Sequence, residues 1–529
     1  MGKKKSFVLV AVLAAVLSVV CLAVILLGGA GVGIDIGKNT ESAVPGAGNA
    51  SHAHSFENGK TCVVCGVVSD EYLKFSLNKD GTYTITGHNF NKTTAYESFG
   101  KARLGLETYW IIEVDVLKLP DTYNGKPVTS IGNSAFKMSD GFEKLYLPAS
   151  ITEIGANAFE KCISVAEVEI EGGKTKIGVG AFRNCKSLKK ITLSDETVSI
   201  GEGTFEDCYK LAEINLVKSI SEIPSRTFYG CSGLKKLHIP SGVVGIAKNA
   251  FEETSDELEI TVAMNNTAYL SKNNCLIEKE SKTLVWQNGS REIPADGSVE
   301  RIDDEVFAYC ELTEIVIPAS VKEIGKKAFY GSKMLEKVTF SSSLEKIGEE
   351  AFANCTKLAS VEIPYMVEEI EYRSFYNCNS LAEVKIPEGV KNIGENAFEA
   401  CIALSAIALP EGVTEIGSSA FEGCALLQSI TLPKSLEKIG HACFSGCEEL
   451  KYIDIPSGVE KLNEQTFKGC ASLEKITLPK ELKSIGKNVF ADCESLAEIA
   501  YLGTKAEWLS MEKKEFKVDC SVHCIDGKM

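Results

Sequence analysis

Large apolar residues recur at a fixed interval along most of this chain. The clearest case is phenylalanine, which returns every 23 residues in two runs, with a single step of 22 residues between Phe307 and Phe329. Self-similarity at such a period is typical of a solenoid, in which each repeat forms one coil. The repeated positions are Phe136, Phe159, Phe182, Phe205, Phe228, Phe251, Phe307, Phe329, Phe352, Phe375, Phe398, Phe421, Phe444, Phe467 and Phe490.

The polar and apolar pattern inside one repeat predicts its local structure. Residues 384–386 alternate apolar, polar and apolar, which indicates a short strand with Lys385 facing solvent. Val390 and Ile393 then face inward, and Phe398 fills the core of the coil. One coil cannot bury these residues alone, so we expect neighbouring coils to stack and to form one continuous core.

A glycine follows the inward-facing isoleucine in most repeats, as at Gly394. Pro224 takes this place in one repeat, and proline fixes φ near −65°. The position therefore does not require a positive φ, and we expect close packing between coils to be the reason for glycine.

These features predict a β-rich solenoid in which short strands stack into a parallel sheet. The predicted organisation is a basic segment at 1–6, an apolar segment at 7–27, a Gly- and Ser-containing stalk at 28–50, a His- and Cys-containing segment at 51–68, a β-rich flank at 69–122, the solenoid at 123–501 with an insertion at 252–300, and a C-terminal cap at 502–529.

The repeat IPxxVxxIGxxAFxxC, as at Ile386–Cys401, resembles that of the BspA-like leucine-rich-repeat family of surface proteins. The resemblance covers about residues 123–501. It implies a leucine-rich-repeat solenoid that is displayed on a cell surface and has an adhesive or scaffolding role, in some members toward host matrix proteins.

The N-terminus predicts a membrane anchor. Lysines at positions 3–5 precede residues 7–27, which carry no charge and are long enough to span a bilayer as a helix. Lysines stay on the cytoplasmic side, so the remainder would lie outside the cell. A cleaved signal peptide is the alternative, and it would make the protein secreted.

The period breaks between Phe251 and Phe307, where 56 residues replace the 46 of two coils. Residues 274–279 and 283–286 are expected to form a hairpin that projects from the array. Trp286 lies in this hairpin, and it is either packed within it or an exposed anchor for a ligand. The other two tryptophans, Trp110 and Trp508, are expected to close the two ends of the core.

Four residues near the N-terminus have the spacing of metal ligands. His52 and His54 form an HxH pair, and Cys62 and Cys65 form a CxxC pair. Imidazole and thiolate together suit a tetrahedral Zn²⁺, so we predict a possible structural zinc here. A disulfide between Cys62 and Cys65, or two free thiols, is the alternative. No cofactor is required elsewhere.

Twelve further cysteines each follow a repeat phenylalanine by three places, as Cys401 follows Phe398. Stacked positions repeat about every 4.8 Å with parallel side chains, which does not suit a disulfide. We therefore expect a column of buried thiols. Cys520 and Cys524 are the better candidates for a disulfide or metal pair.

Composition and charge narrow the function further. Apolar residues make up 44% of the chain and charged residues 24%, as in globular proteins. The net charge of −16 argues against nucleic-acid binding, which needs clustered Lys and Arg. The sequence contains no known catalytic motif, and its six histidines are scattered. We therefore expect that the chain is not an enzyme; a cryptic enzyme is the remote alternative.

The solvent-facing side chains of the predicted strands are the ones that a ligand would contact. They are polar and mixed, without a row of aromatic residues, which favours a protein ligand over a carbohydrate. We therefore predict an adhesin or protein-binding module for an extracellular host matrix or cell-surface protein; a structural spacer without a specific ligand is the alternative. The candidate ligand-binding residues are Thr192, His238, Trp286, Lys385, Asp454 and Thr477.

Overall fold

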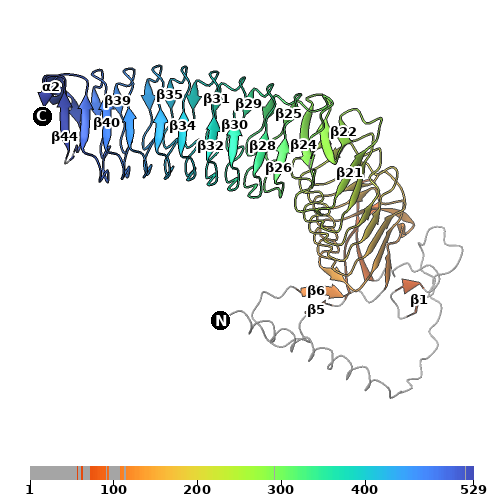
Figure 1. Cartoon of the computed structure of the whole chain (residues 1–529). Helices are drawn as coiled ribbons and strands as arrows, with labels where there is room; N and C mark the ends of the chain where they lie inside the picture. The colour runs from red at the N-terminus through yellow and green to blue at the C-terminus, as the bar shows by residue number, and fades with distance from the viewer. Residues whose placement is uncertain are drawn as a thin grey trace, which may run out of the picture. The chain divides into compact units, whose positions relative to one another are not determined.

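The computed structural model of this chain describes residues 56–57, 61–62, 72–90, 92–94, 108–111, 115–290, 292–516, 518 and 520–529 (Figure 1). The predicted apolar segment at 7–27 and stalk at 28–50 lie outside these residues. Among the residues described, no helix has the length and apolar character needed to cross a membrane.

The solenoid is built from short parallel strands, and equivalent strands of neighbouring coils lie side by side (Figure 1). Equivalent residues of neighbouring coils are in register, as Val361 and Val384 are. This first strand row consists of β7 (Val116–Lys118), β11 (Lys144–Leu147), β13 (Glu167–Ile170), β15 (Lys190–Thr192), β17 (Glu213–Ile214), β19 (Lys236–Ile239), β21 (Glu259–Val262), β26 (Glu314–Val316), β28 (Lys337–Thr339), β30 (Ser360–Glu362), β32 (Glu383–Lys385), β34 (Ala406–Ala408), β36 (Ser429–Thr431), β38 (Tyr452–Asp454), β40 (Lys475–Leu478), β42 (Glu498–Tyr501) and β44 (Ser521–Cys524).

A second row of mostly two-residue strands follows the first within each coil and contains the inward-facing isoleucine. It consists of β9 (Lys126–Ile131), β12 (Glu153–Ile154), β14 (Lys176–Ile177), β16 (Ser199–Ile200), β18 (Glu222–Ile223), β20 (Gly245–Ile246), β25 (Arg301–Ile302), β27 (Glu323–Ile324), β29 (Lys346–Ile347), β31 (Glu369–Ile370), β33 (Asn392–Ile393), β35 (Glu415–Ile416), β37 (Lys438–Ile439), β39 (Lys461–Leu462), β41 (Ser484–Ile485) and β43 (Glu512–Lys513). In β32 of the first row, Val384 is buried and Lys385 exposed, which confirms the predicted alternation.

The repeat phenylalanines form two columns of stacked rings inside the solenoid. Phe398 is fully buried, and its ring centroid lies 5.5 Å from those of both Phe375 and Phe421. The first column ends at Phe251 and the second begins at Phe307. The predicted role of these residues as the core of each coil is confirmed.

The glycine after the inward isoleucine is fixed by close packing between coils. A Cβ atom on Gly417 would lie 2.5 Å from the backbone nitrogen of Glu395 in the preceding coil, and one on Gly440 would lie 2.3 Å from that of Ser418. Neither glycine has a positive φ. The explanation predicted from Pro224 is therefore correct.

The cysteines that follow the phenylalanines form a column of free thiols. The thiol of Cys424 donates a hydrogen bond to the backbone carbonyl of Phe398 in the preceding coil, at 3.2 Å. Ser332 makes the same bond to Phe307, at 2.8 Å, which explains why this position accepts small weak donors. Burial raises the pKa of the Cys185 and Cys378 thiols to about 12, so these thiols are unreactive in the folded protein.

The insertion contains the predicted hairpin, but the expectation that it projects from the array is wrong. The strands β22 (Tyr269–Lys272), β23 (Cys275–Glu278) and β24 (Thr283–Gln287) pair antiparallel, and β24 then pairs parallel with β25. Leu276 packs on the core that precedes the insertion, whereas Ile277 and Leu284 pack on the core that follows it. The unit is therefore a layer within the solenoid, because both of its faces are apolar.

The two ends of the array are closed by different side chains. At the C-terminal end, α2 (Lys505–Ser510) begins at a capping box of Thr504 and Glu507, and its buried Trp508 contacts Phe516, which packs against Phe490. Trp508 thus closes the core as predicted. The last strand, β45 (Gly527–Lys528), pairs antiparallel with β44.

At the N-terminal end, His88 closes the core by stacking on Phe136, with 5.4 Å between ring centroids. His88 ends β4 (Tyr83–His88), which pairs with β3 (Leu73–Leu77) and with β9. The remaining strands of this end are β1 (Phe56–Glu57), β2 (Thr61–Cys62), β5 (Lys92–Thr94), β6 (Thr108–Ile111), β8 (Thr122–Tyr123) and β10 (Ser139–Asp140). Trp110 lies in β6, where the structure gives the course of the backbone.

Candidate ligand-binding surface

The first strand row presents a face of alternating charge before the insertion. Lys144 forms an ion pair with Glu167 at 2.8 Å, and Lys190 forms one with Glu213 at 3.2 Å. These residues occupy the same position in successive coils, so each charge faces the opposite charge of its neighbour. The alternation neutralises the stacked charges, and the backbones of β11, β13, β15 and β17 pair in this part of the row.

The ladder is broken between β17 and β19. At the equivalent place in paired coils, the backbones are joined by bonds such as that from the Lys190 N–H to the Ala166 carbonyl, at 3.2 Å. The equivalent bond from Lys236 to Ala212 is absent, although both residues lie in the described part of the chain. β17 and β19 belong to different sheets for this reason.

Asn215 is the residue that distinguishes this break from the regular coils. Where the ladder is closed, the residue at this position accepts a hydrogen bond through its backbone carbonyl, as Thr477 does from the N–H of Ile455. At Asn215 the side chain does so instead: its Oδ1 accepts from the Leu193 N–H at 2.8 Å, and its Nδ2 donates to the Leu193 carbonyl at 3.1 Å. The backbone of residue 215 therefore leaves the ladder, and β17 ends at Ile214.

A hollow of about 710 Å³ lies on the first strand row at this break. Its volume is within the range of small-molecule and peptide pockets. Polar and charged side chains from both sides of the break line it, together with the backbone of the intervening residues. The polar lining residues are Lys190, Thr192, Glu213, Asn215, Lys236, His238, Glu259 and Thr261.

A second hollow of similar volume lies on the second strand row, where an asparagine again replaces a regular residue. Asn463 occupies the glycine position, and its Nδ2 donates to the Ile439 carbonyl at 2.6 Å. In regular coils the glycine N–H makes this bond, as Gly440 does to Ile416. β37 and β39 are unpaired here, so both hollows coincide with a rung that an asparagine side chain has replaced.

The structure brings some of the predicted ligand-binding residues together and leaves others apart. Thr192 and His238 line the same hollow, two coils apart, and His238 Nδ1 lies 3.0 Å from Thr261 Oγ1. Asp454 and Thr477 are direct neighbours across β38 and β40. Lys385 lies in another part of the row, in the last strand of its sheet, with Glu383 3.9 Å and Glu362 4.0 Å away.

Trp286 was predicted as a ligand-binding residue, but it is not an exposed anchor. Its side chain is partly buried and packs against the core that precedes the insertion. The ring meets Phe251 edge to face, with 5.8 Å between centroids, and so covers the end of the first phenylalanine column. The prediction that Trp286 contacts a ligand remains untested, but the ring has a packing role.

Most of the predicted zinc site lies outside the described residues. This applies to His52, His54 and Cys65, whereas Cys62 is the last residue of β2, which pairs with β1. The described residues contain no group of three or more potential ligands with the geometry of a metal site. The zinc site at this motif therefore stays a prediction. Cys520 and Cys524 are not joined by a disulfide.

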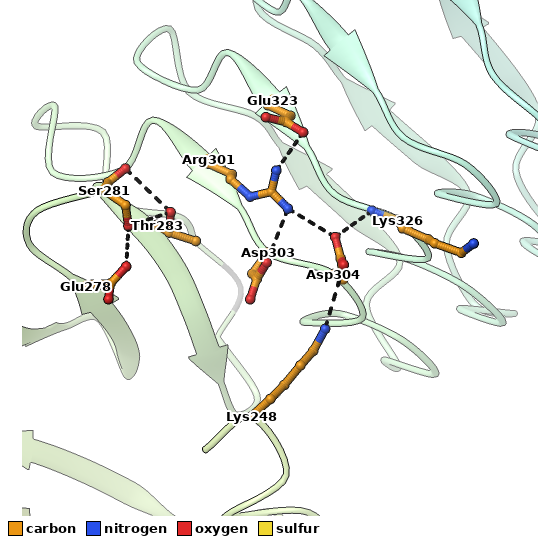
Figure 2. A network of polar contacts seen from close by, with 9 residues as sticks. All are labelled: Lys248, Glu278, Ser281, Thr283, Arg301, Asp303, Asp304, Glu323 and Lys326. Carbon is orange, nitrogen blue, oxygen red and sulfur yellow. Dashed lines mark hydrogen bonds and ion pairs between the residues drawn. The ribbon is translucent and has the colours of Figure 1, made fainter. Parts of the chain in front are cut away.

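A polar network fixes the restart of the solenoid after the insertion, as Figure 2 shows. Arg301 in β25 donates to Asp303 and Asp304, and it pairs with Glu323 of the next coil at 2.6 Å. Lys248, from the coil before the insertion, lies 4.0 Å from Asp304. The network links the two sides of the insertion.

The sequence reasoning did not select Asn215 or the neighbouring charged residues of the hollow as ligand-binding candidates. A signal was present, because Asn215 is followed by Leu-Val where regular coils have an Ile-Pro or Leu-Pro pair. The effect of the side chain on the ladder could not be read from spacing, since it depends on which backbone groups the amide reaches.

The stacked coils, with parallel strands in register and an inward phenylalanine in each coil, define a leucine-rich-repeat solenoid. A family model described as the BspA type leucine rich repeat region matches residues 127–271, 300–426 and 391–509, in six copies. The chain belongs to this family. A comparison with curated protein sequences gave no match.

Solved structures of bacterial repeat proteins resemble the chain. A leucine-rich repeat protein from Bacteroides ovatus is 26% identical, with a TM-score of 0.51, and the match covers 82% of this chain and 99% of that protein. A leucine rich cell surface protein from Faecalibacterium prausnitzii is 23% identical, with a TM-score of 0.33, over 85% and 98% of the two chains. The pneumococcal vaccine antigen PcpA is 18% identical, with a TM-score of 0.41, over 85% and 98%. The first of these supports the solenoid fold.

Proposed function

We propose that this protein is a non-enzymatic binding module that captures an extracellular protein through the first strand row of its solenoid. The observation that carries the proposal is the hollow at the break between β17 and β19. It offers unpaired backbone groups, a histidine and side chains of both charges in one place on the first strand row. Such a mixture suits recognition of a protein surface or segment.

The proposal includes display outside the cell. The basic residues at positions 3–5 and the uncharged residues 7–27 support a membrane anchor with a cytoplasmic N-terminus, or alternatively secretion. Host matrix and cell-surface proteins are the ligands that an adhesin of this kind would meet. The role of a spacer without a ligand is the outcome if no such protein binds.

The test is capture of purified extracellular matrix proteins by the immobilised full chain, with charge-reversal variants as a probe of the surface. We expect Lys190→Glu with Lys236→Glu to weaken capture at least tenfold, because both side chains line the hollow. The matched control is Lys337→Glu with Lys475→Glu, which changes the same repeat position in regular coils. The control should bind as the wild type does.

Two results would contradict the proposal. Absence of capture for every matrix protein would favour the spacer. Equal losses in the two double variants would show that binding depends on net charge and not on the hollow.

A further inference from the structure

The break between β17 and β19 exposes backbone groups that a parallel ladder normally pairs. In such a ladder alternate residues direct both their N–H and C=O groups to the same neighbouring strand. The outward-facing residues direct theirs to the preceding coil, as the Lys385 carbonyl does when it accepts from the Ile363 N–H. In β19 these residues are Lys236 and His238.

In a closed ladder, Lys236 and His238 would pair with backbone groups of the preceding coil, and these groups are unpaired as well. The bond from the Leu216 N–H to the His238 carbonyl, equivalent to that from Ile363 to Lys385, is absent, and Leu216 lies within the described part of the chain. On the other side of the break, Ile214 has no strand partner toward β19. Backbone donors and acceptors thus face one another across the hollow without pairing.

The two coils remain joined on the side away from the strands. The Phe228 N–H donates to the Ala250 carbonyl at 2.9 Å, and the Gly230 N–H donates to the Glu252 carbonyl at 3.0 Å. The phenylalanine rings of these coils also stay stacked, with 6.0 Å between centroids. The opening is therefore confined to the strand side, while the core of the solenoid stays intact.

We propose that this break is a strand-addition site, at which an extended segment of the protein ligand pairs with the exposed backbone of β19 and β17. An extended peptide is the occupant that offers N–H and C=O groups at the spacing of a strand, and strand addition is a known mode of peptide recognition. The inference rests on the proposed binding function and names the part of the ligand that is recognised.

The side chains around the break define the segment. β19 has four residues, so about four residues of the ligand can pair with it. Glu213 and Lys236 occupy the same repeat position on the two sides of the break. A segment residue between them meets a negative and a positive charge at once, which favours a neutral polar residue such as serine or threonine.

A second copy of this chain is a poor occupant. Its first-row strands are already paired within their own array, as β36 is with β34. The segment therefore comes from a partner protein that has an extended stretch outside regular structure.

The probe for the test is a fluorescent, blocked hexapeptide with the sequence of residues 427–432, Leu-Gln-Ser-Ile-Thr-Leu, on a short soluble tag. This sequence forms β36 in the solenoid and places serine and threonine at the required positions. We expect saturable binding to the full chain by fluorescence anisotropy. The same peptide N-methylated at the serine and threonine should bind at least tenfold more weakly, because it lacks the N–H donors of one edge.

The matched variants are Asn215→Thr and Thr431→Val. Threonine stands at the position of Asn215 in several paired strands, as at Thr431 and Thr477. Asn215→Thr should therefore restore the rung, close the break, reduce peptide binding at least tenfold and raise the melting temperature. Thr431→Val, in a regular coil, should leave peptide binding unchanged. Unfolding of Asn215→Thr would be visible in the same melt, and the N-methylated peptide would then decide the result.

The outcomes separate this inference from the proposed function. If the chain captures a matrix protein but binds the two peptides equally, strand addition is wrong and the binding function stands. If the peptide binds in the wild type and in Asn215→Thr with the same affinity, the break is not the site.

Discussion

Replacing Phe398 by alanine should lower the free energy of unfolding by about 3–5 kcal/mol, since a fully buried aromatic side chain is removed and a cavity is left. The ring stacks on those of Phe375 and Phe421 at 5.5 Å, so both neighbouring coils lose contacts. Because each coil contacts only its neighbours, the loss should be concentrated around this coil. Urea denaturation followed by circular dichroism measures the effect.

Two control variants make this result specific. Phe398→Leu keeps most of the apolar volume and should cost about 1 kcal/mol. Tyr365→Ala removes an aromatic ring of similar size from a side chain that is 68% exposed, and it should change stability by less than about 0.5 kcal/mol. Equal losses in Phe398→Ala and Tyr365→Ala would contradict the assignment of the phenylalanine column as the core.

Acid should destabilise the N-terminal end of the solenoid through His88. Burial, with a smaller contribution from Lys74, lowers the pKa of His88 to about 4 from an ordinary value of 6.5. The unfolded chain therefore binds a proton in the pH range where the folded chain does not. The stability that neutral His88 provides is complete above pH 6.5 and is lost as the pH falls from 6.5 to 4.

The size of this loss follows from the pKa difference, and amounts to about 3 kcal/mol at pH 4. The measurement is the stability of the wild type relative to His88→Gln, which does not titrate but can still reach Ser139, the residue 2.7 Å from His88 Nε2. Between pH 7 and pH 4, the free energy of unfolding of the wild type should fall relative to that of His88→Gln by about 3 kcal/mol. Carboxylates elsewhere titrate in both proteins, so parallel pH profiles would contradict the role of His88.

The regular parts of the fold could be predicted because contacts between coils join residues 23 positions apart. This spacing explains why the roles of Phe398, Gly394 and Cys401 were all readable from the sequence. Each position repeats, and substitutions such as Pro224 and Ser332 show which property the position requires.

The insertion and the effect of Asn215 could not be predicted in the same way, because the insertion and an asparagine at this position each occur in a single coil. In the insertion, Leu276 and Ile277 are adjacent and both are buried, each on a different core, so the strand has no solvent-facing side. A hairpin with two apolar faces is a layer, whereas a projecting hairpin would expose one of them. At the break, the decisive contact is between the Asn215 side chain and the backbone of Leu193, which repeat spacing does not reveal.

The central claim is that the backbone ladder of the first strand row is open between β17 and β19 and closed where β40 pairs with β38 and β42. Amide hydrogen exchange of the full chain, resolved to single residues, tests it most directly by comparing Lys236 and His238 with Lys475 and Thr477. The last two occupy the same repeat positions in β40, which is paired on both sides. We expect the amides of Lys236 and His238 to exchange at least a hundredfold faster, because they lack acceptors. Equal protection of the two pairs would show that the ladder is closed at β17 and β19 and would contradict the account.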